Sequence, residues 1–304
     1  MAISRAQLVK ELEPGLNALF GLEYKRYDNQ HAEIYTNESS DRAFEEEVML
    51  SGFANANVKV EGSGVNYDQS QETYTARYTH DTIALAFAIT EEAIEDNLYD
   101  KISSRYTKAL ARSMSNAKQV KAAAPLNNGL PTADGFDSGD GKSLFNTAHT
   151  TVSGTNVKNT LTTQADLNET SLEQALIDIA AFTDERGLRV AAKGVKMIIP
   201  SANQFSAERL LKSQGRTGTA DNDINAVASM GMVPQGYRVN NFLTDSDSWY
   251  IITDCPNGMK MFTRAPLTTA MEGDFDTGNV RYKARERYSF GVSDYRGIFG
   301  CEGA

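Results

Sequence analysis

Residues 272–304 read EGDFDTGNVRYKARERYSFGVSDYRGIFGCEGA, and a long two-faced strand lies at the centre of this stretch. Between Val280 and Val292, every even position except Glu286 carries an apolar or aromatic side chain, and the odd positions from 281 to 287 carry cationic ones. Because successive side chains of a strand point to opposite faces, this period of two predicts one apolar and one cationic face. At strand rise the segment spans about 43 Å, roughly twice the usual strand length. Such a strand crosses most of a domain and needs long neighbours.

The odd positions form a cationic row. Its members are Arg281, Lys283, Arg285 and Arg287. A row of this kind is usually a solvated sheet face. Here the charges stand about 7 Å apart in a chain whose formal net charge is -10, so carboxylates of another segment or subunit are the alternative partners. On the apolar face, Glu286 lies between Ala284 and Tyr288, and its carboxylate needs a cation or hydrogen bonds.

Length and composition limit the class of protein. The 304 residues are 40% hydrophobic, which is enough for a real core. No apolar run approaches the ~18 residues of a membrane span, and Met1–Lys10 lacks the order of a signal peptide, so a cytosolic protein is expected. The two cysteines, Cys255 and Cys301, form no zinc or redox pattern. The excess of 40 acidic over 30 basic residues disfavours a protein that wraps nucleic acid.

The first 50 residues divide into a helical and an irregular part. Apolar side chains recur at helical spacing from Leu8 to Phe20, and Pro14-Gly15 is expected to interrupt or restart this helix. Residues 25–43 show no periodicity, which is unusual for a stretch of this length inside a compact domain. We therefore interpret them as an arm that lies on something else.

Residues 55–82 predict a long β-hairpin with few apolar side chains. Val58 and Val60 alternate with charged residues before a polar, Gly-rich middle, and Tyr74 and Tyr78 alternate with polar residues after it. An isolated two-stranded hairpin is marginal in water. The hairpin therefore docks either on a neighbouring subunit or on its own domain, and the sequence favours neither.

The longest predicted helix begins at Thr90 as its N-cap. Glu91, Glu92 and Glu95 suit the positive end of the helix dipole. One apolar stripe then consists of Ile94, Leu98, Ile102, Tyr106, Leu110, Met114 and Ala117. No Gly or Pro intervenes before Pro125, so about 33 residues form a rod near 50 Å long.

The middle third of the chain predicts a compact α/β unit. A capping box at Thr170 and Glu173 begins one helix, Val195–Ile199 is a short apolar strand, and Ser201 caps a second helix. The remaining elements are a loop at Gly215–Asp223 and strands at 237–243, 249–253 and 260–263.

No catalytic, cofactor or metal site is predicted. The segment GDGKS at 139–143 ends like a phosphate-binding loop, but Phe136 stands where that motif needs Gly. The aspartates of this region are spaced by three residues, whereas a calcium loop needs alternate positions and a closing Glu. His149, with Ser153 and Asp140 nearby in sequence, is better explained as a histidine hydrogen-bonded within a turn than as a catalytic base.

Four blocks of sequence resemble the major head subunits of Mu-like phages and prophages. They are ITEEAIEDNLYDKISSRYTKALARSM at 89–114, LFNTAHT at 144–150, LNETSLEQALIDIAAFTDERGL at 167–188 and GDFDTGNVRYKARERYSFGVSDYRGIFG at 273–300. The order of arm, polar hairpin, long helix, α/β unit and closing strand is also similar to tailed-phage major capsid proteins with the Hong Kong 97 fold. The resemblance runs over most of the chain.

This resemblance implies an α+β capsid subunit in five parts. They are an N-terminal arm (1–50), an E-loop hairpin (51–89), a peripheral domain with the spine helix (90–160), an axial α/β domain (161–272) and the closing strands of the peripheral domain (273–304). In such families the hairpin lies over an adjacent subunit, and axial loops meet around capsomer axes. We expect assembly contacts at Tyr67, Tyr74, Arg77, Tyr78, Arg281, Lys283, Arg285, Glu286 and Arg287.

The implied function is structural, without catalysis or a cofactor. Copies arranged as hexamers and pentamers would form an icosahedral shell around phage double-stranded DNA, without sequence-specific binding, in the virion and, during assembly, in the host cytoplasm. The implied partners are a separate scaffolding protein, a portal protein and decoration proteins, with no membrane. An encapsulin-like compartment of the same fold is the alternative. An α/β enzyme, supported only by the element order of the middle unit, is the most distant one.

Overall fold

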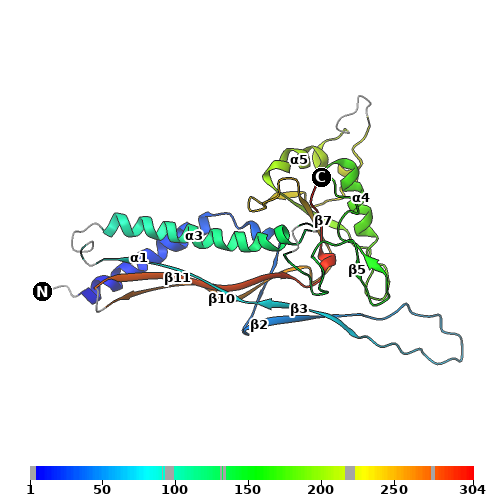
Figure 1. The fold of residues 1–304 in the computed structure, drawn as a ribbon, viewed down its shortest axis with the longest axis horizontal. Coiled ribbons are helices and arrows are strands. Elements are labelled where there is room, and N and C mark those ends of the chain that lie inside the picture. Colours follow the sequence, from blue (N-terminus) through cyan, green and yellow to red (C-terminus); the bar gives the residue numbers. More distant parts are fainter. Residues whose placement is uncertain are drawn as a thin grey trace.

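The computed structural model describes residues 5–90, 92, 99–130, 132, 135–215, 223–274 and 278–304. A long sheet with two helices on one face forms an elongated body, and a compact α/β unit stands at one end of it (Figure 1). A thin β-ribbon leaves the junction of the two and projects beyond the compact unit. The amino-terminal end lies at the far end of the elongated body, and the carboxyl terminus lies in the compact unit.

The long sheet has four strands in the order β1-β10-β11-β4. β10 (Met259–Gly273) and β11 (Val280–Val292) form an antiparallel hairpin, and β4 (Asp81–Ile89) pairs antiparallel with the other side of β11. The short β1 (Thr36–Ser39) runs parallel to β10. The strand predicted at 280–292 is therefore confirmed, and its side chains alternate between buried and exposed from Val280 to Glu286.

Two helices cover the apolar face of this sheet (Figure 1). α1 (Arg5–Arg26) and α3 (Tyr99–Asn128) pack on each other and on β11. Their shared core contains Leu16, Phe20, Leu110, Met114 and Tyr282, all at most 5% exposed. Pro14 lies inside α1, so the expected interruption was wrong, because burial of the residues that follow it holds the helix against α3. No described helix is both long and apolar enough to cross a membrane.

The long helix also continues past its expected end. α3 includes Pro125 and stops at Asn128. The helix continues past the proline because Leu126 is fully buried and its carbonyl accepts a 3.2 Å hydrogen bond from Tyr250 Oη. Gly129 follows, where an added Cβ would lie 2.5 Å from the carbonyl oxygen of Pro125. The 30 residues of α3 make a rod of about 45 Å. Of the predicted start of this helix, Glu91 and residues 93–98, including Glu95, lie outside the described residues.

The irregular segment 25–43 lies on its own chain. It contains η1 (Gln30–Glu33) and β1. The backbone N–H of His31 donates to Gln119 Oε1 at 3.0 Å, and Tyr35 Oη donates to the carbonyl of Ala122 at 2.7 Å. The surface on which this segment rests therefore consists of α3 and the edge of β10 in the same subunit.

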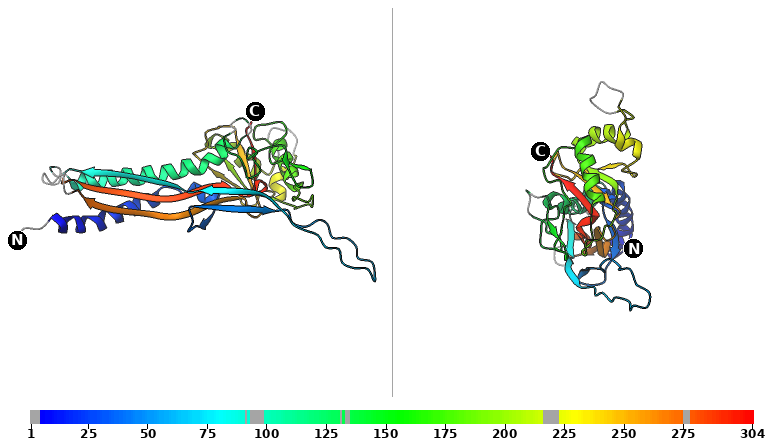
Figure 2. Two further views of the ribbon diagram at one scale, coloured as in Figure 1. Left: turned by 60° about the horizontal axis from the view of Figure 1, so that its bottom comes forward. Right: turned by 90° about the vertical axis from the view of Figure 1, so that its right-hand side faces the viewer.

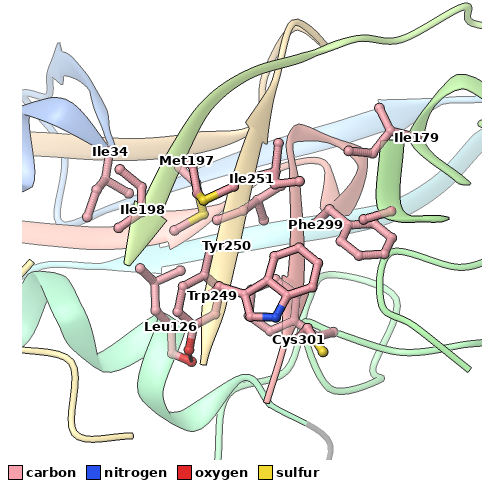
Figure 3. Packing of buried hydrophobic residues seen from close by; sticks show 14 of the residues in the cluster. Ile34, Leu126, Ile179, Met197, Ile198, Trp249, Tyr250, Ile251, Phe299 and Cys301 are labelled. Atoms are coloured by element: carbon pink, nitrogen blue, oxygen red, sulfur yellow. Dashed lines mark hydrogen bonds between the residues drawn. The ribbon is translucent and has the colours of Figure 1, made fainter. Parts of the chain in front are cut away.

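The compact unit is built on a second sheet with the order β12-β9-β7-β8. Its strands are β7 (Gly194–Ile199), β8 (Tyr237–Val239), β9 (Trp249–Thr253) and β12 (Ile298–Cys301). Its helices are η2 (Ser201–Asn203), η3 (Tyr295–Gly297), α4 (Glu169–Ala180), α5 (Gln204–Lys212) and α6 (Ala226–Met230). Figure 3 shows the core of this unit, in which Met197, Trp249, Tyr250, Ile251 and Phe299 are fully buried. The short β5 (His149–Thr150) and β6 (Asn156–Val157) form a separate two-stranded sheet.

The strands near the carboxyl terminus divide differently from the sequence-based expectation. The strand expected at 260–263 continues to Gly273 and belongs to the long sheet, whereas β12 pairs with β9 in the compact unit. The pairing of β10 with β11 shifts register between Thr263 and Thr268, around Pro266. This irregularity interrupts the alternation of side chains, so the sequence pattern did not indicate that the strand continues. The two units are therefore joined by strands that begin in one and end in the other.

The predicted hairpin also has different strands. β2 (Phe44–Leu50) pairs antiparallel with β3 (Glu72–Thr79), so residues assigned to the arm form its first strand. Residues 51–71 form no strand, although a strand was expected around Val58 and Val60. We call residues 44–79 the ribbon and residues 53–71 its tip.

Candidate assembly surface

The cationic row lies on the open face of the long sheet, opposite α1 and α3. Arg281, Lys283 and Arg285 are exposed and Arg287 is half-buried. Small residues of β4 stand directly beside the row: Arg281 pairs with Ala88, Lys283 with Ala86, Arg285 with Ala84 and Arg287 with Thr82. This surface, which we call the cationic face, therefore has a line of long charged side chains flanked by short ones.

Few carboxylates of the described chain reach this row. Arg281 Nη2 lies 2.5 Å from Asp274 Oδ2, and Glu272 is the cross-strand neighbour of Arg281. Among the described residues, no carboxylate forms an ion pair with Lys283, Arg285 or Arg287. Like charges about 7 Å apart repel one another, so an anionic partner would stabilise this face.

Glu286 points to the other side of the same strand and finds its partners within the subunit. Its Oε2 lies 3.3 Å from Lys118 Nζ on α3 and accepts a 3.4 Å hydrogen bond from Tyr24 Oη on α1. Burial raises the pKa of the Glu286 carboxyl, and the Lys118 charge offsets that rise only in part. With 2% of its side chain exposed, Glu286 joins both helices to the sheet and offers no surface to another copy.

The ribbon tip is exposed along its whole length. Val58 is 94% exposed and Tyr67 is 97% exposed, and all other residues from 53 to 71 are exposed as well. The two sides are joined where the backbone N–H of Ala54 donates to Asp68 Oδ2 at 2.7 Å. The tip projects away from both bodies in each view (Figure 2). Its apolar side chains therefore have no cover within the described subunit.

The base of the ribbon is fixed to the subunit by one face of β3. Tyr78 is buried, forms a 2.5 Å hydrogen bond with Ser293 Oγ and packs against Gly291, where an added Cβ would lie 2.6 Å from its ring. Tyr74 is half-buried on the same face. Arg77 points outward, 4.0 Å above the ring of Phe44. Arg77 and the tip residue Tyr67 are thus accessible, whereas Tyr74 and Tyr78 serve mainly to attach the ribbon.

A second attachment, which the sequence analysis missed, lies beside the tip. Arg186 Nη2 donates to the carbonyl of Gln69 at 2.5 Å and lies 3.8 Å from Asp68 Oδ1. The preceding residue, Glu185, forms a buried 2.7 Å ion pair with Arg296. No local pattern marks these residues, since their partners are more than 100 positions away.

The histidine considered as a catalytic base, His149, lies in β5 and is held by hydrogen bonds. His149 is fully buried, with Nδ1 2.6 Å from Asp140 Oδ2 and Nε2 3.2 Å from Asn159 Oδ1. Ser153 Oγ instead bonds to Thr151 and Thr155. No described group of three or more His, Cys, Asp or Glu could hold a metal ion. Of the loop expected at Gly215–Asp223, residues 216–222 lie outside the described residues.

One sequence-family model matches the chain. The sequence model described as "Phage capsid protein" matches residues 73–300, which are 228 of the 304 residues. No curated protein matches the sequence.

Solved structures show the same fold at low identity. The capsid of an empty GTA particle has a TM-score of 0.59 at 14% identity, with 91% of each chain covered. The capsid of Myoviridae phage XM1 has a TM-score of 0.53 at 12% identity, with 89% of each chain covered. The procapsid of bacteriophage JBD30 has a TM-score of 0.54 at 14% identity, covering 99% of this chain and 77% of that one. The expected Hong Kong 97-type fold is confirmed.

Proposed function

The chain belongs to the phage capsid protein family, and we propose that its copies associate through the ribbon and the cationic face into the hexamers and pentamers of an icosahedral head. This head encloses double-stranded DNA without sequence-specific contacts. A separate scaffolding protein, a portal protein and decoration proteins are its further partners, and assembly takes place in the host cytoplasm. The narrower likeness to Mu-like phages and prophages stays a prediction from the sequence blocks.

The observation that carries this proposal is the exposed ribbon tip. Apolar side chains such as Val58, Val60 and Tyr67 are 69–97% exposed. Arg186 contacts the tip at Asp68 and Gln69, and this contact leaves those apolar side chains uncovered. Exposed apolar area on a thin projection is costly in water and is stabilised when another surface covers it. A neighbouring copy supplies such a surface at every position in a closed shell.

The cationic face supplies the second contact. Three of its four cations have no carboxylate partner in the described chain, although the chain as a whole carries an excess of acidic residues. Single exposed ion pairs contribute only about 0.2–1 kcal/mol each. Repeated over every subunit, contacts of this size hold a shell and still allow misplaced copies to dissociate.

Two variants test these contacts during co-expression with the scaffolding and portal proteins of the same phage. Arg285→Glu with Arg287→Glu reverses the charge of the row, and Val58→Ser with Tyr67→Ser makes the tip polar. Each should reduce the yield of particles in electron micrographs and sedimentation while circular dichroism shows a folded subunit. Arg209→Glu with Lys212→Glu, on the distant α5, is the control. Particle yield equal to that of the unchanged chain would refute the proposal.

The encapsulin-like compartment is the weaker alternative, since the matching family is that of phage capsid proteins. The contents of purified particles separate the two functions. Phage double-stranded DNA inside the shell supports the capsid, whereas an enclosed enzyme without DNA supports the compartment. We further propose that the subunit has no enzymatic role, and turnover of a substrate by the folded subunit would contradict this.

A further inference from the structure

The outer edge of β4 is open in the described chain. β4 is the last strand of the long sheet, and its backbone pairs only with β11 among the described strands. It runs along the margin of the elongated body for nine residues (Figure 2). An unpaired strand edge offers a row of N–H and C=O groups to any further strand. Proteins use such edges to add an extended segment from another chain.

The side chains around this edge define what the added segment must carry. On the cationic face, Ala84 and Ala86 are the only side chains between Arg285 or Lys283 and the edge. Neighbouring strands lie about 4.8 Å apart, so an added strand would lie about 10 Å from β11. Long cationic side chains reach across a single alanine to carboxylates on that strand.

The opposite face of β4 has the complementary requirement. Leu85 is 46% exposed there, and its neighbours Ile83 and Phe87 are half-buried. Because strand side chains alternate, an added strand that presents carboxylates to the cationic face presents every second residue to Leu85. Apolar residues at those positions would cover it.

We propose that the β4 edge accepts an extended segment that pairs as an added strand, with carboxylates at every second position and apolar residues between them. In the assembled head a neighbouring copy supplies this segment, and that identification of the partner rests on the proposed function. Nucleic acid is the other polyanion that could meet the row. A nucleic acid does not pair with an open strand edge as an extended peptide does, and the net negative charge of the chain repels it.

Two synthetic peptides of one composition test the pairing on the soluble subunit. The first alternates glutamate and valine over nine residues, and the second groups the glutamates before the valines. NMR titration should show shifts in the amides of β4 with the alternating peptide, and about tenfold weaker binding of the grouped peptide, a difference of about 1.4 kcal/mol. Equal binding of both peptides, or no shift in β4 up to the solubility limit, would overturn the proposal.

Two variants separate edge pairing from simple charge attraction. Ala86→Glu and Thr268→Glu each place one carboxylate beside the row, but only residue 86 stands between the row and the open edge. Both positions are exposed, so both variants should fold. Ala86→Glu should weaken the alternating peptide about tenfold and Thr268→Glu by about threefold or less.

Equal losses in the two variants, together with equal shifts caused by a DNA duplex, would identify a general anion-binding face and refute the added strand. The peptide assay does not depend on assembly. If the peptides fail while Arg285→Glu with Arg287→Glu still lowers particle yield, the edge inference falls and the proposed function stands.

Discussion

Replacing Lys118 with methionine tests how the helices are held to the sheet. The Lys118 Nζ lies 3.3 Å from Glu286 Oε2, and the exposed fractions of the two side chains are 17% and 2%. Removing one member of a buried ion pair leaves an uncompensated charge, which typically costs about 3–5 kcal/mol. Since Tyr24 still donates a hydrogen bond to Glu286, we expect a loss near the lower figure, about 3 kcal/mol, at pH 8.

The loss should shrink as the pH falls. Burial already raises the pKa of Glu286 above its ordinary value, and removal of Lys118 raises it further. A carboxyl with a raised folded-state pKa contributes stability that is present below its unfolded pKa and is lost as the pH rises through the folded pKa. Lys118→Met should therefore come closer to the unchanged protein at pH 5 than at pH 8.

Urea unfolding followed by the fluorescence of Trp249, the single tryptophan, measures these free energies. Lys121→Met, three positions along α3, is the matched control, because Lys121 pairs with the exposed Asp81 and should lose less than about 1 kcal/mol. Glu286→Gln should abolish most of the cost of Lys118→Met. A cost below about 1 kcal/mol with no dependence on pH would refute the assigned role of the buried pair.

Three further predictions concern other parts of the subunit. His31 has its pKa lowered to about 4 by burial and by the nearby Lys118 charge, so the free energy of unfolding should fall by about 3 kcal/mol as the pH drops from 6.5 to 4, and His31→Gln should flatten this slope in urea titrations. Arg186→Ala should accelerate proteolytic cleavage of the ribbon tip while changing global stability by less than about 1 kcal/mol; unchanged cleavage would argue against the attachment. Gly291→Ala should cost about 1–3 kcal/mol, because the new Cβ meets the Tyr78 ring, whereas Gly273→Ala, with open space around it, serves as the neutral control in thermal melts.

Features whose signal is local could be predicted from the sequence. The alternation in β11 specifies its two faces without reference to any other segment, and the structure places it at 280–292 as expected. The buried position of Glu286 follows from the same alternation. The sequence could not name Lys118 and Tyr24 as its partners, since they come from helices 168 and 262 positions away.

Features that depend on distant partners were missed or misplaced. β1 has the sequence TNES, which is a poor strand former, and it is a strand only because the edge of β10 offers it hydrogen bonds. β2 contains three consecutive glutamates, and Glu47 is accommodated by Lys260, 213 positions later. At α4, the capping box consists of Asn168 and Ser171, not Thr170 and Glu173, because the helix begins two residues earlier than the expected N-cap indicates.

The ribbon and the long sheet share one continuous backbone. β3 ends at Thr79 and β4 begins at Asp81, with only His80 between them, held by hydrogen bonds to Ser40 and Ser289. Tension applied at the tip therefore passes along covalent bonds into β4 and loads its nine paired positions with β11 in shear. Hydrogen bonds loaded in this direction must break together and not one after another. A pull on the ribbon from a neighbouring copy would therefore be resisted by all nine paired positions at once.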